Sequence, residues 1–547
     1  MKGQVARIGR LWRTVRWLKA EQVIWRIRLR LPYRQPDLRP APPRRVALGT
    51  WVAPAAREPS LVGPTCMRLL NEEHDLSEVG WDDPAVALLW RYNQHYFDDL
   101  NSLAGESRRA WQRALVQRWS NENPPGRGTG WASFPTSLRI VNWVKWWLSG
   151  EPASRASMQS LAVQARWLMR RIEWHLLGNH LFANAKALMF AGLVFEGAEA
   201  SAWLDEGLRI LRRELPEQIL ADGGQFERSP MYHALALEDV LDLVNVISTL
   251  APIDSPARRL LPQLCASASA MLHWMRCLRH PGGVLARFND CADGVAPPTD
   301  DLERYARELG ITAAPAGDDG IHRLEPSGYV RASRGAAVAL LDVAPIGPDY
   351  LPGHAHADTL SFELSIAGRE LVVNRGTSVY GDGARRQWER STAAHSTVQV
   401  GEHDSSEVWA AFRVGRRARP GPVQIAGWVL DASHNGYTHL AGAPRHHRRW
   451  RFDANAMLVE DCIDPPSSQP AVACFHFAPG LSLECAEPQV WRICDGKVEF
   501  VRVHVLVGSG EQLTTQHAPR FGLLVEADTL FVRLSGGRAT VRFAWST

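Results

Sequence analysis

The spacing of apolar residues changes once along the chain, near Pro281-Gly282-Gly283. From Asp82 to about Met275, apolar residues recur with helical spacing in the segments 84–101, 108–120, 136–149, 155–177, 180–196, 200–220, 231–250 and 257–278. Breaks that contain Gly or Pro, such as Gly150-Glu151-Pro152, separate these segments. Seven or eight helices joined by short loops predict an all-α bundle or an α/α toroid.

The second part of the chain alternates apolar and polar residues with a period of two. The clearest stretches are 329–332, 337–341, 360–364, 371–373, 498–507, 522–527, 530–534 and 539–545. Many short strands separated by turn residues predict an antiparallel β-sandwich or stacked sheets. We therefore predict a helical domain over 66–290, a linker over 291–326 and a β-sheet domain over 327–547, with a cleft between the two domains.

Residues 1–65 form a separate segment. Apolar residues at helical spacing alternate with arginines over 4–31, which predicts one basic amphipathic helix ending at Pro32 and followed by a Pro-rich connector. Such a helix can lie on an anionic membrane or dock a partner. It can equally pack on the rest of the protein with its arginines in solvent, and the sequence favours neither alternative.

Composition narrows the classes of function. A chain of 547 residues is too long for one compact core. The net charge is +4, but residues 1–50 alone carry thirteen Lys and Arg against Glu21 and Asp37, so the remainder is net acidic. This distribution argues against a protein-wide nucleic-acid surface. The 22 tryptophans suit a carbohydrate-binding cleft, although tryptophan is also an ordinary core residue.

The sequence shows no sign of export or of a disulfide framework. The eight cysteines have no CxxC or zinc-ribbon spacing, which predicts free thiols. No apolar run approaches the ~20 residues of a membrane span. Arginines interrupt the N-terminal segment, unlike a signal peptide. We expect cytoplasmic residence, with the periplasm as the alternative.

One short stretch, Gly353-His354-Ala355-His356-Ala357-Asp358, carries unusual polar content. In an extended strand its two histidines and its aspartate would share one face. That arrangement suits a metal or catalytic site. The alternative is an exposed strand edge with a chance His-x-His pair.

Two further polar stretches precede apolar helices. Asn179 and His180 follow a glycine break, where a helix N-terminus offers NH groups, although Asn179 would also serve as an N-cap. The stretch 222–233 ends in Ser229-Pro230, which predicts an N-cap and a first helical position. Tyr232 would then lie in the first turn and face the cleft.

Several motifs in order resemble the heparinase II/III-like polysaccharide lyase superfamily, including its alginate-lyase relatives. They are Gly178-Asn179-His180, the run from Phe226 to His233, the run from Gly353 to Asp358, and the run from Ala394 to Val398. The run from Tyr92 to Phe97 also resembles a helix of relatives from bacterial exopolysaccharide clusters. The resemblance implies an incomplete α/α toroid followed by a C-terminal antiparallel β-sandwich. It also implies β-elimination on polysaccharides that contain uronic acids.

The resemblance also implies roles for individual residues. Asn179 with His180 would neutralise the uronate carboxylate, while Tyr232 would act as base or acid with His354 as its partner. Substrate contacts would come from Glu227, Arg228, His233, Asn289, Tyr380 and Arg390. His356, Asn374 and His395 match the positions that hold one divalent metal ion, zinc or calcium, although relatives have an acidic residue where this chain has Asn374.

Two other functions fit the same residues. A glycoside hydrolase needs two carboxylates, for which Glu227, Asp222, Asp290 and Glu238 are candidates. A non-catalytic glycan-binding protein would have lost its metal site. The Asn, Tyr and His set favours a lyase acting on an anionic exopolysaccharide, with residues 4–31 holding it near a membrane or a biosynthetic complex.

Overall fold

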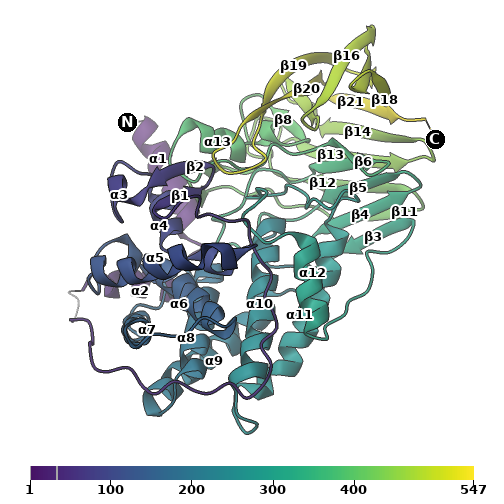
Figure 1. The fold of residues 1–547 in the computed structure, drawn as a ribbon. Helices are drawn as coiled ribbons and strands as arrows, with labels where there is room; N and C mark the ends of the chain where they lie inside the picture. Colours follow the sequence, from purple (N-terminus) through teal and green to yellow (C-terminus); the bar gives the residue numbers. More distant parts are fainter. Residues whose placement is uncertain (1, 32–34, 547) are drawn as a thin grey trace.

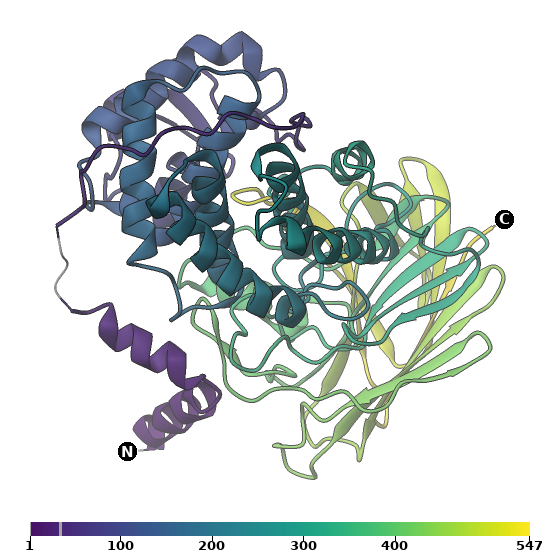
Figure 2. The ribbon, with the colours of Figure 1, turned by 90° about the horizontal axis from the view of Figure 1, so that it is seen from below.

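The computed structural model describes residues 2–31 and 35–546, with side chains from Arg7 onward. A helical part comes first and a sheet part second, and the two lie against each other (Figure 1). Seen from below, the helices form an open arc on one side of the stacked sheets (Figure 2).

The helical part matches the predicted segments closely. Its helices are α3 (Leu76–Val79), α4 (Leu88–Gln94), α5 (Arg109–Glu122), α6 (Ser133–Leu148), α7 (Arg155–Met169), α8 (Gly178–Val194), α9 (Ala198–Gln218), α10 (Pro230–Leu250), α11 (Leu261–Cys277) and α12 (Thr299–Glu308). A small hairpin of β1 (Cys66–Leu69) and β2 (Glu72–Asp75) precedes them. The helix predicted over 155–177 ends earlier, at Met169.

Apolar burial, rather than surface patterning, positions the central helices. Nearly every residue of α8 and α10 is buried, so both helices run through the middle of the helical part. Tryptophans fill the spaces around them, and Trp90, Trp119, Trp143 and Trp274 are fully buried. These tryptophans therefore serve the core.

The sheet part contains three main antiparallel sheets. The first has five strands in sequence order, β3 (Gly320–Leu324), β4 (Tyr329–Arg334), β5 (Ala337–Asp342), β6 (Phe362–Ile366) and β7 (Arg369–Val372). The largest has eight strands in the order β11-β12-β13-β14-β21-β18-β17-β16, with bounds β11 Gln424–Ala426, β12 Val429–His434, β13 Arg445–Phe452, β14 Ala456–Asp464, β21 Arg538–Ala544, β18 Val498–Val507, β17 Val490–Asp495 and β16 Leu481–Glu487.

The third sheet has four strands in the order β19-β20-β15-β8, with bounds β19 Ser509–His517, β20 Val525–Arg533, β15 Ala471–His476 and β8 Val398–Val400. The strands predicted over 522–527 and 530–534 are one continuous strand, β20. The three sheets share one apolar core, which the inward residues of alternating strands such as β13 supply. The sheet prediction is confirmed.

Two predictions about local structure differ from the structure. The stretch 353–358 is a loop rather than a strand, so its side chains do not alternate about a sheet. The predicted linker 291–326 contains α12 and β3. Leu302, Tyr305 and Ala306 of α12 are buried in the helical core, and the Pro- and Asp-rich flanks concealed this short helix in the sequence.

The N-terminal segment forms two helices instead of one. They are α1 (Lys2–Val15) and α2 (Ala20–Arg28), separated by a bend, and Pro32 lies outside the described residues. Both pack on the protein, and Figure 2 shows them at one corner, beside the loops of the sheet part. No helix within 2–31 and 35–546 is long and apolar enough to cross a membrane. All eight cysteines are free, as predicted.

Candidate functional site

Tyr232 is held at the start of α10. Ser229 is the N-cap and its hydroxyl accepts a hydrogen bond from the backbone NH of Tyr232 (3.1 Å), while Pro230 occupies the first helical position, as predicted. The phenol ring stacks on His354, with ring centroids 3.8 Å apart. Its hydroxyl lies 3.1 Å from that of Tyr380. Burial, followed by the Asp290 carboxylate, raises the pKa of Tyr232, so the phenol keeps its proton.

Asn179 and His180 lie in the first turn of α8. The N-cap is Leu177, so Asn179 is not the N-cap that the sequence allowed. Its half-exposed side chain hydrogen-bonds no other described residue, and it stands where NH groups and the helix dipole favour an anion. His180 Nδ1 lies 3.2 Å from Glu173 Oε1. Burial lowers the pKa of His180, but Glu173 outweighs burial and the net shift is upward.

Glu227 lies on one side of His354. Its Oε2 atom is 3.8 Å from His354 Nε2 and has no hydrogen-bond partner among the described residues, while Gln225 donates to its Oε1 (3.3 Å). The side chain is buried, and burial raises its pKa. The site therefore contains a carboxyl group with one free oxygen.

Asp290, in the loop between α11 and α12, lies on the other side of His354 and binds the histidines of the sheet side. His354 Nδ1 lies 3.0 Å and His356 Nε2 2.8 Å from its two oxygens, and Arg386 donates to both oxygens. Burial opposes ionisation, but Arg386 and the two histidines hold the pKa of Asp290 well below its usual range. An ionised carboxylate only accepts, so Nδ1 of His354 carries the hydrogen and Nε2 faces Glu227 and the site.

Two aromatic residues complete the sheet side. The half-buried Tyr380 lies under Arg386, with the guanidinium carbon 4.8 Å from the ring centroid. Phe412, on the loop between β9 (Val408–Trp409) and β10 (Arg413–Val414), packs edge-on against the ring of His354. The sequence predictions did not include the roles of Asp290 and Phe412. The sequence suggested Asp290 only as a possible catalytic acid of a hydrolase. Phe412 belongs to no recognised motif.

His356 and His395 face each other. Their Nδ1 and Nε2 atoms are 3.1 Å apart. His395 donates through Nδ1 to the carbonyl of Ser391 (2.7 Å), and His356 donates through Nε2 to Asp290. In neutral rings the two facing nitrogens would both carry lone pairs, and either a proton on one ring or a bound metal ion would satisfy them.

Asn374, the third predicted metal ligand, bonds to the protein instead of facing the two histidines with a free atom. The side-chain oxygen of Asn374 accepts from the backbone NH of Ser396 (3.1 Å), and its amide nitrogen lies 3.5 Å from Ser361 Oγ. Burial lowers the pKa of His356 to about 3, which favours a neutral, metal-binding ring. The two histidines thus fit a metal ion, while Asn374 presents no free ligand atom.

Three predicted substrate contacts are instead used by the protein. His233 accepts from the NH of Gln225 and donates to the carbonyl of Met271, and it is fully buried. The buried Asn289 accepts from the NH of His356 and donates to the carbonyl of Arg228.

Arg390, also fully buried, donates to the carbonyls of Ala355, Ala410 and Ala411. These three side chains therefore shape the loops of the site. Arg228 is half-exposed, but its guanidinium donates to the carbonyl of Ser327.

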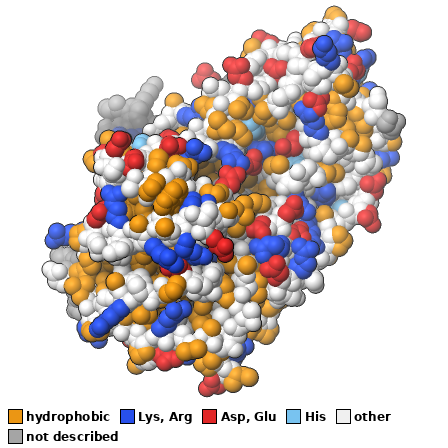
Figure 3. All heavy atoms as spheres, viewed as in Figure 1, with side chains coloured by type: hydrophobic (Ala, Val, Ile, Leu, Met, Phe, Trp, Pro, Cys, Tyr) orange, Lys and Arg blue, Asp and Glu red, His pale blue; other side chains and the backbone are white. Residues whose placement is uncertain are grey.

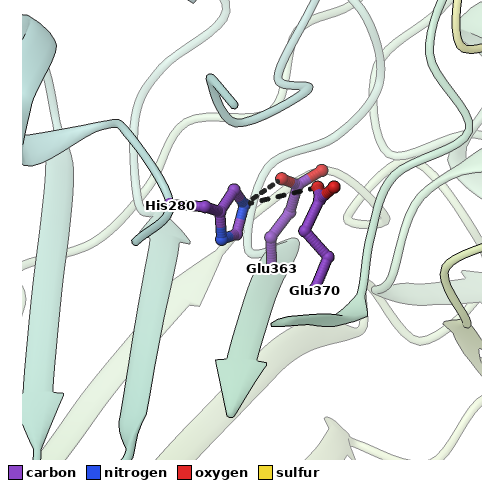
Figure 4. A group of neighbouring side chains, drawn as sticks. All are labelled: His280, Glu363 and Glu370. Atoms are coloured by element: carbon purple, nitrogen blue, oxygen red, sulfur yellow. Dashed lines mark hydrogen bonds and ion pairs between the residues drawn. The ribbon is translucent and has the colours of Figure 1, made fainter. Parts of the chain in front are cut away.

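A second ionisable cluster lies at the edge of the five-stranded sheet (Figure 4). Among the described residues, His280, Glu363 and Glu370 are the one group of three His, Cys, Asp or Glu side chains close enough to share a metal ion. Arg287 already donates to Glu370 (2.5 Å), and Glu363 accepts from His280 (2.8 Å) and from the NH of Asn374 (2.7 Å). Arginine and backbone donors thus already satisfy these carboxylates.

Charged side chains gather along the boundary between the two parts of the molecule (Figure 3). The motif residues that the sequence singled out at distant positions meet at this boundary. Tyr232 comes from α10, Asn179 from α8 and His354 from a loop of the sheet part.

Comparison with known proteins identifies the family. The profile described as heparinase II/III N-terminus matches residues 111–297, and that described as heparinase II/III-like, C-terminal, matches residues 317–546. A heparin-sulfate lyase of Bacteroides stercoris is 26% identical over 303 residues, which cover 52% of this chain and 43% of that protein. FtsZ-localized protein C of Caulobacter vibrioides is 27% identical over 309 residues, 53% of this chain and 50% of that protein.

The chain thus spans about half the length of these curated relatives. The crystal structure of a heparan sulfate lyase mutant from Pedobacter heparinus superposes with a TM-score of 0.57 at 18% identity, covering 87% of this chain and 80% of that one. This likeness confirms the predicted fold, an α/α toroid followed by a β-sandwich. Since the two profiles match in order and together cover more than half of the sequence, the chain belongs to the heparinase II/III-like superfamily.

Proposed function

We propose that the protein is a polysaccharide lyase that cleaves a uronate-containing polysaccharide by β-elimination. The observation that carries the proposal is the stacked pair of Tyr232 and His354, with Glu227 3.8 Å from His354 and the helix N-terminus that carries Asn179 bonded to Glu227. This set supplies a proton acceptor, a proton donor and an anion site at the junction of two domains.

In the reaction a base removes the proton on C5 of the uronate. The electron pair forms the C4–C5 double bond, the C4–O bond breaks, and an acid protonates the departing oxygen. His354 suits the first step, because Asp290 binds its Nδ1–H and leaves Nε2 as the acceptor. Tyr232 suits the last step, because its raised pKa keeps the phenol protonated.

Removal of the C5 proton places further negative charge next to the uronate carboxylate. Donors that are fixed in advance stabilise that charge most effectively in a site with little water. Asn179 offers its amide, and His180 adds an imidazole whose pKa is raised by Glu173. Both stand at the positive end of α8.

The contacts of the acidic residues argue against glycoside hydrolysis, which needs two suitably placed carboxyl groups. Glu238 is bound by Arg57 and Lys145, and Asp222 by the NH and hydroxyl of Ser327. Asp290 is ionised and held by Arg386. Among these candidates Glu227 alone keeps a free oxygen.

We also propose that His356 and His395 bind a divalent metal ion, for which two imidazoles favour zinc over calcium. When bound, the ion would supply positive charge to these two imidazoles, and His356 would keep its Nε2 hydrogen bond to Asp290. It would then order the carboxylate that orients His354. No proton transfer needs to pass through it.

The test is a screen of uronate polymers, including heparan sulfate, alginate and bacterial exopolysaccharides, read by the ultraviolet absorbance of the unsaturated uronate. A lyase raises this absorbance as chains shorten. Chain shortening without absorbance would favour a hydrolase, and binding without shortening would favour a glycan-binding protein. Either result would overturn the proposal.

A further inference from the structure

The two N-terminal helices have their apolar faces outward. In α1, Leu11, Trp12 and Val15 follow Ile8 by three, four and seven residues, so the four side chains share one face. That face points to solvent, with 62% of Ile8 and 64% of Trp12 exposed. In α2 and just beyond, Val23, Ile24, Ile27 and Leu31 are also exposed, Ile27 and Leu31 to 63% each. We call these eight residues the N-terminal apolar face.

The opposite faces of both helices hold them to the protein. Arg13 of α1 makes two hydrogen bonds to Glu407, and Thr14 accepts from the indole NH of Trp409. In the second helix the buried Gln22 donates to the carbonyl of Tyr350 (3.4 Å). The helices are therefore fixed in an orientation that leaves the apolar face uncovered.

Salt bridges to the helical part reinforce this orientation. Lys19 Nζ lies 2.5 Å from Glu217, and Arg213 donates to Glu21 (2.6 Å). Packing on the domain alone would turn the apolar residues inward, so this arrangement calls for a second surface.

The charges beside the apolar face indicate what that surface is. Arg7 and Arg16 flank the apolar residues of α1 on either side of the helix, and Arg28 and Arg30 flank those of α2; all four are exposed. The one acidic residue between Arg7 and Leu31 is Glu21, which Arg213 neutralises. Exposed apolar residues bordered by unopposed arginines match the interface of an anionic bilayer.

We propose that the N-terminal apolar face docks the protein on an anionic lipid surface. The apolar side chains would enter the boundary between headgroups and acyl chains, and the arginines would contact lipid phosphates. The proposal is independent of the lyase activity, since no residue of the face touches the Tyr232 and His354 pair.

Docking would bring the site close to the bilayer. The β9–β10 hairpin that α1 grips through Glu407 and Trp409 also carries Phe412, which packs against His354. The membrane-facing helix α1 and one wall of the site therefore contact the same hairpin. A polymer that leaves the membrane would then meet the site close to the membrane surface.

The test is co-sedimentation of the full chain with vesicles of phosphatidylglycerol and phosphatidylcholine, compared with phosphatidylcholine alone. We expect binding that needs the anionic lipid and weakens as salt is added. Trp12→Glu with Ile27→Glu should weaken binding roughly tenfold or more, because both apolar anchors become charged. The matched control is Ile253→Glu, whose residue is 91% exposed on the distant loop after α10. It should bind like the parent.

Three outcomes would overturn the proposal. They are no sedimentation with anionic vesicles, equal binding to both vesicle types, and a double variant that binds as tightly as the parent. Size-exclusion chromatography adds an independent readout. A dimer that the double variant converts to a monomer would show that a second copy of the chain, and not lipid, covers the face. Because all the altered side chains are exposed, circular dichroism should show unchanged folding.

Discussion

The helical and sheet sides of the site contrast in what holds their functional groups in place. On the helical side, Asn179 and Tyr232 stand on the first turns of α8 and α10, whose other residues are almost all buried and mostly apolar. On the sheet side, His354 and His356 lie in a loop without regular structure, and one buried carboxylate, Asp290, binds both.

This contrast separates chemistry from stability. A group presented by an apolar helix can be changed with little effect on folding, because its neighbours do not depend on it. A group in a buried charge network cannot be changed without loss of stability. Each partner that loses its counter-charge stays buried without water to solvate it. Matched substitutions on the two sides should therefore give different combinations of lost activity and lost stability.

The largest expected effect is on catalysis and comes from the helical side. In Tyr232→Phe the ring and its stacking on His354 remain, but the proton donor is gone. We expect kcat to fall by ~10²–10⁴-fold with an unchanged melting temperature. Initial rates of absorbance increase on the best substrate measure this.

Tyr350→Phe is the control, since it removes a hydroxyl that bonds Glu217 and does not touch Tyr232. A Tyr232→Phe protein with near-normal rates would remove the phenol from the mechanism.

The corresponding substitution in the charge network that holds the sheet side is Asp290→Asn. It leaves Arg386 buried without its carboxylate, and it leaves one acceptor oxygen where His354 and His356 each bond their own. We expect a loss of about 3–5 kcal/mol in the free energy of unfolding, together with a large fall in kcat. Urea denaturation of both proteins gives the first quantity. Unchanged stability would show that the Asp290 network is not what holds the loop.

A smaller effect concerns unfolding by acid. As the pH falls, we expect the sheet part to lose stability before the helical part. Burial opposes ionisation of Asp461, but Arg448 and His446 lower its pKa to about 2. Because this value is below that of the unfolded chain, ~3.9, the stabilisation is complete above that pH and disappears as the pH falls toward 2. The shift corresponds to ~2–3 kcal/mol.

Unfolding followed from pH 5 downward should therefore show a steep loss of stability that Asp461→Asn makes shallower. Asp431→Asn is the control, because that side chain forms an exposed pair with Arg449. If the free energy of unfolding falls equally steeply with pH in the Asp461→Asn variant and in the parent, Asp461 is not the group responsible.

The sequence predicted the helical side more fully than the sheet side, and the reason is physical. Helix starts follow local rules, so Ser229-Pro230 was sufficient to place Tyr232 in the first turn. The Asp290 hub depends on contacts across 64 or more residues of sequence, which no local pattern encodes. Alternation suggested a strand at 353–358 because alanines separated the polar residues, yet Asp290 and the carbonyl contacts of Arg390 hold that stretch as a loop.

Burial explains the remaining differences. His233, Asn289 and Arg390 have the chemistry of substrate contacts, and a motif alone could not reveal that the protein uses all three internally. The N-terminal spacing predicted one helix, and the structure has two, α1 and α2. Their orientation, with polar residues inward, depends on Glu407 and Glu217, which lie in distant parts of the chain.

A further prediction addresses the metal site on the sheet side. Asn374→Asp changes the shape of the side chain little, and both neighbours, the NH of Ser396 and the hydroxyl of Ser361, can donate to a carboxylate. We expect the variant to bind zinc about tenfold more tightly than the parent, because a charged oxygen joins His356 and His395.

Zinc content by elemental analysis, and the melting temperature with and without chelator, measure this effect. His395→Ala in the Asn374→Asp background should abolish the gain. A gain that survives removal of His395 would place the ion elsewhere, for which the His280, Glu363 and Glu370 cluster is the first alternative.

The smallest expected effect comes from Glu227→Gln, the helical-side counterpart of Asp290→Asn across His354. Burial raises the pKa of Glu227 above its unfolded value of ~4.3, so its contribution to stability is present at low pH and is lost as the pH rises through the folded pKa. The amide cannot ionise. We therefore expect the variant to match the parent near pH 4 and to be more stable by up to ~1 kcal/mol near pH 7. Urea denaturation at the two pH values measures the difference, and a Glu227→Gln protein as unstable as Asp290→Asn would show that both sides of the site are held by charge.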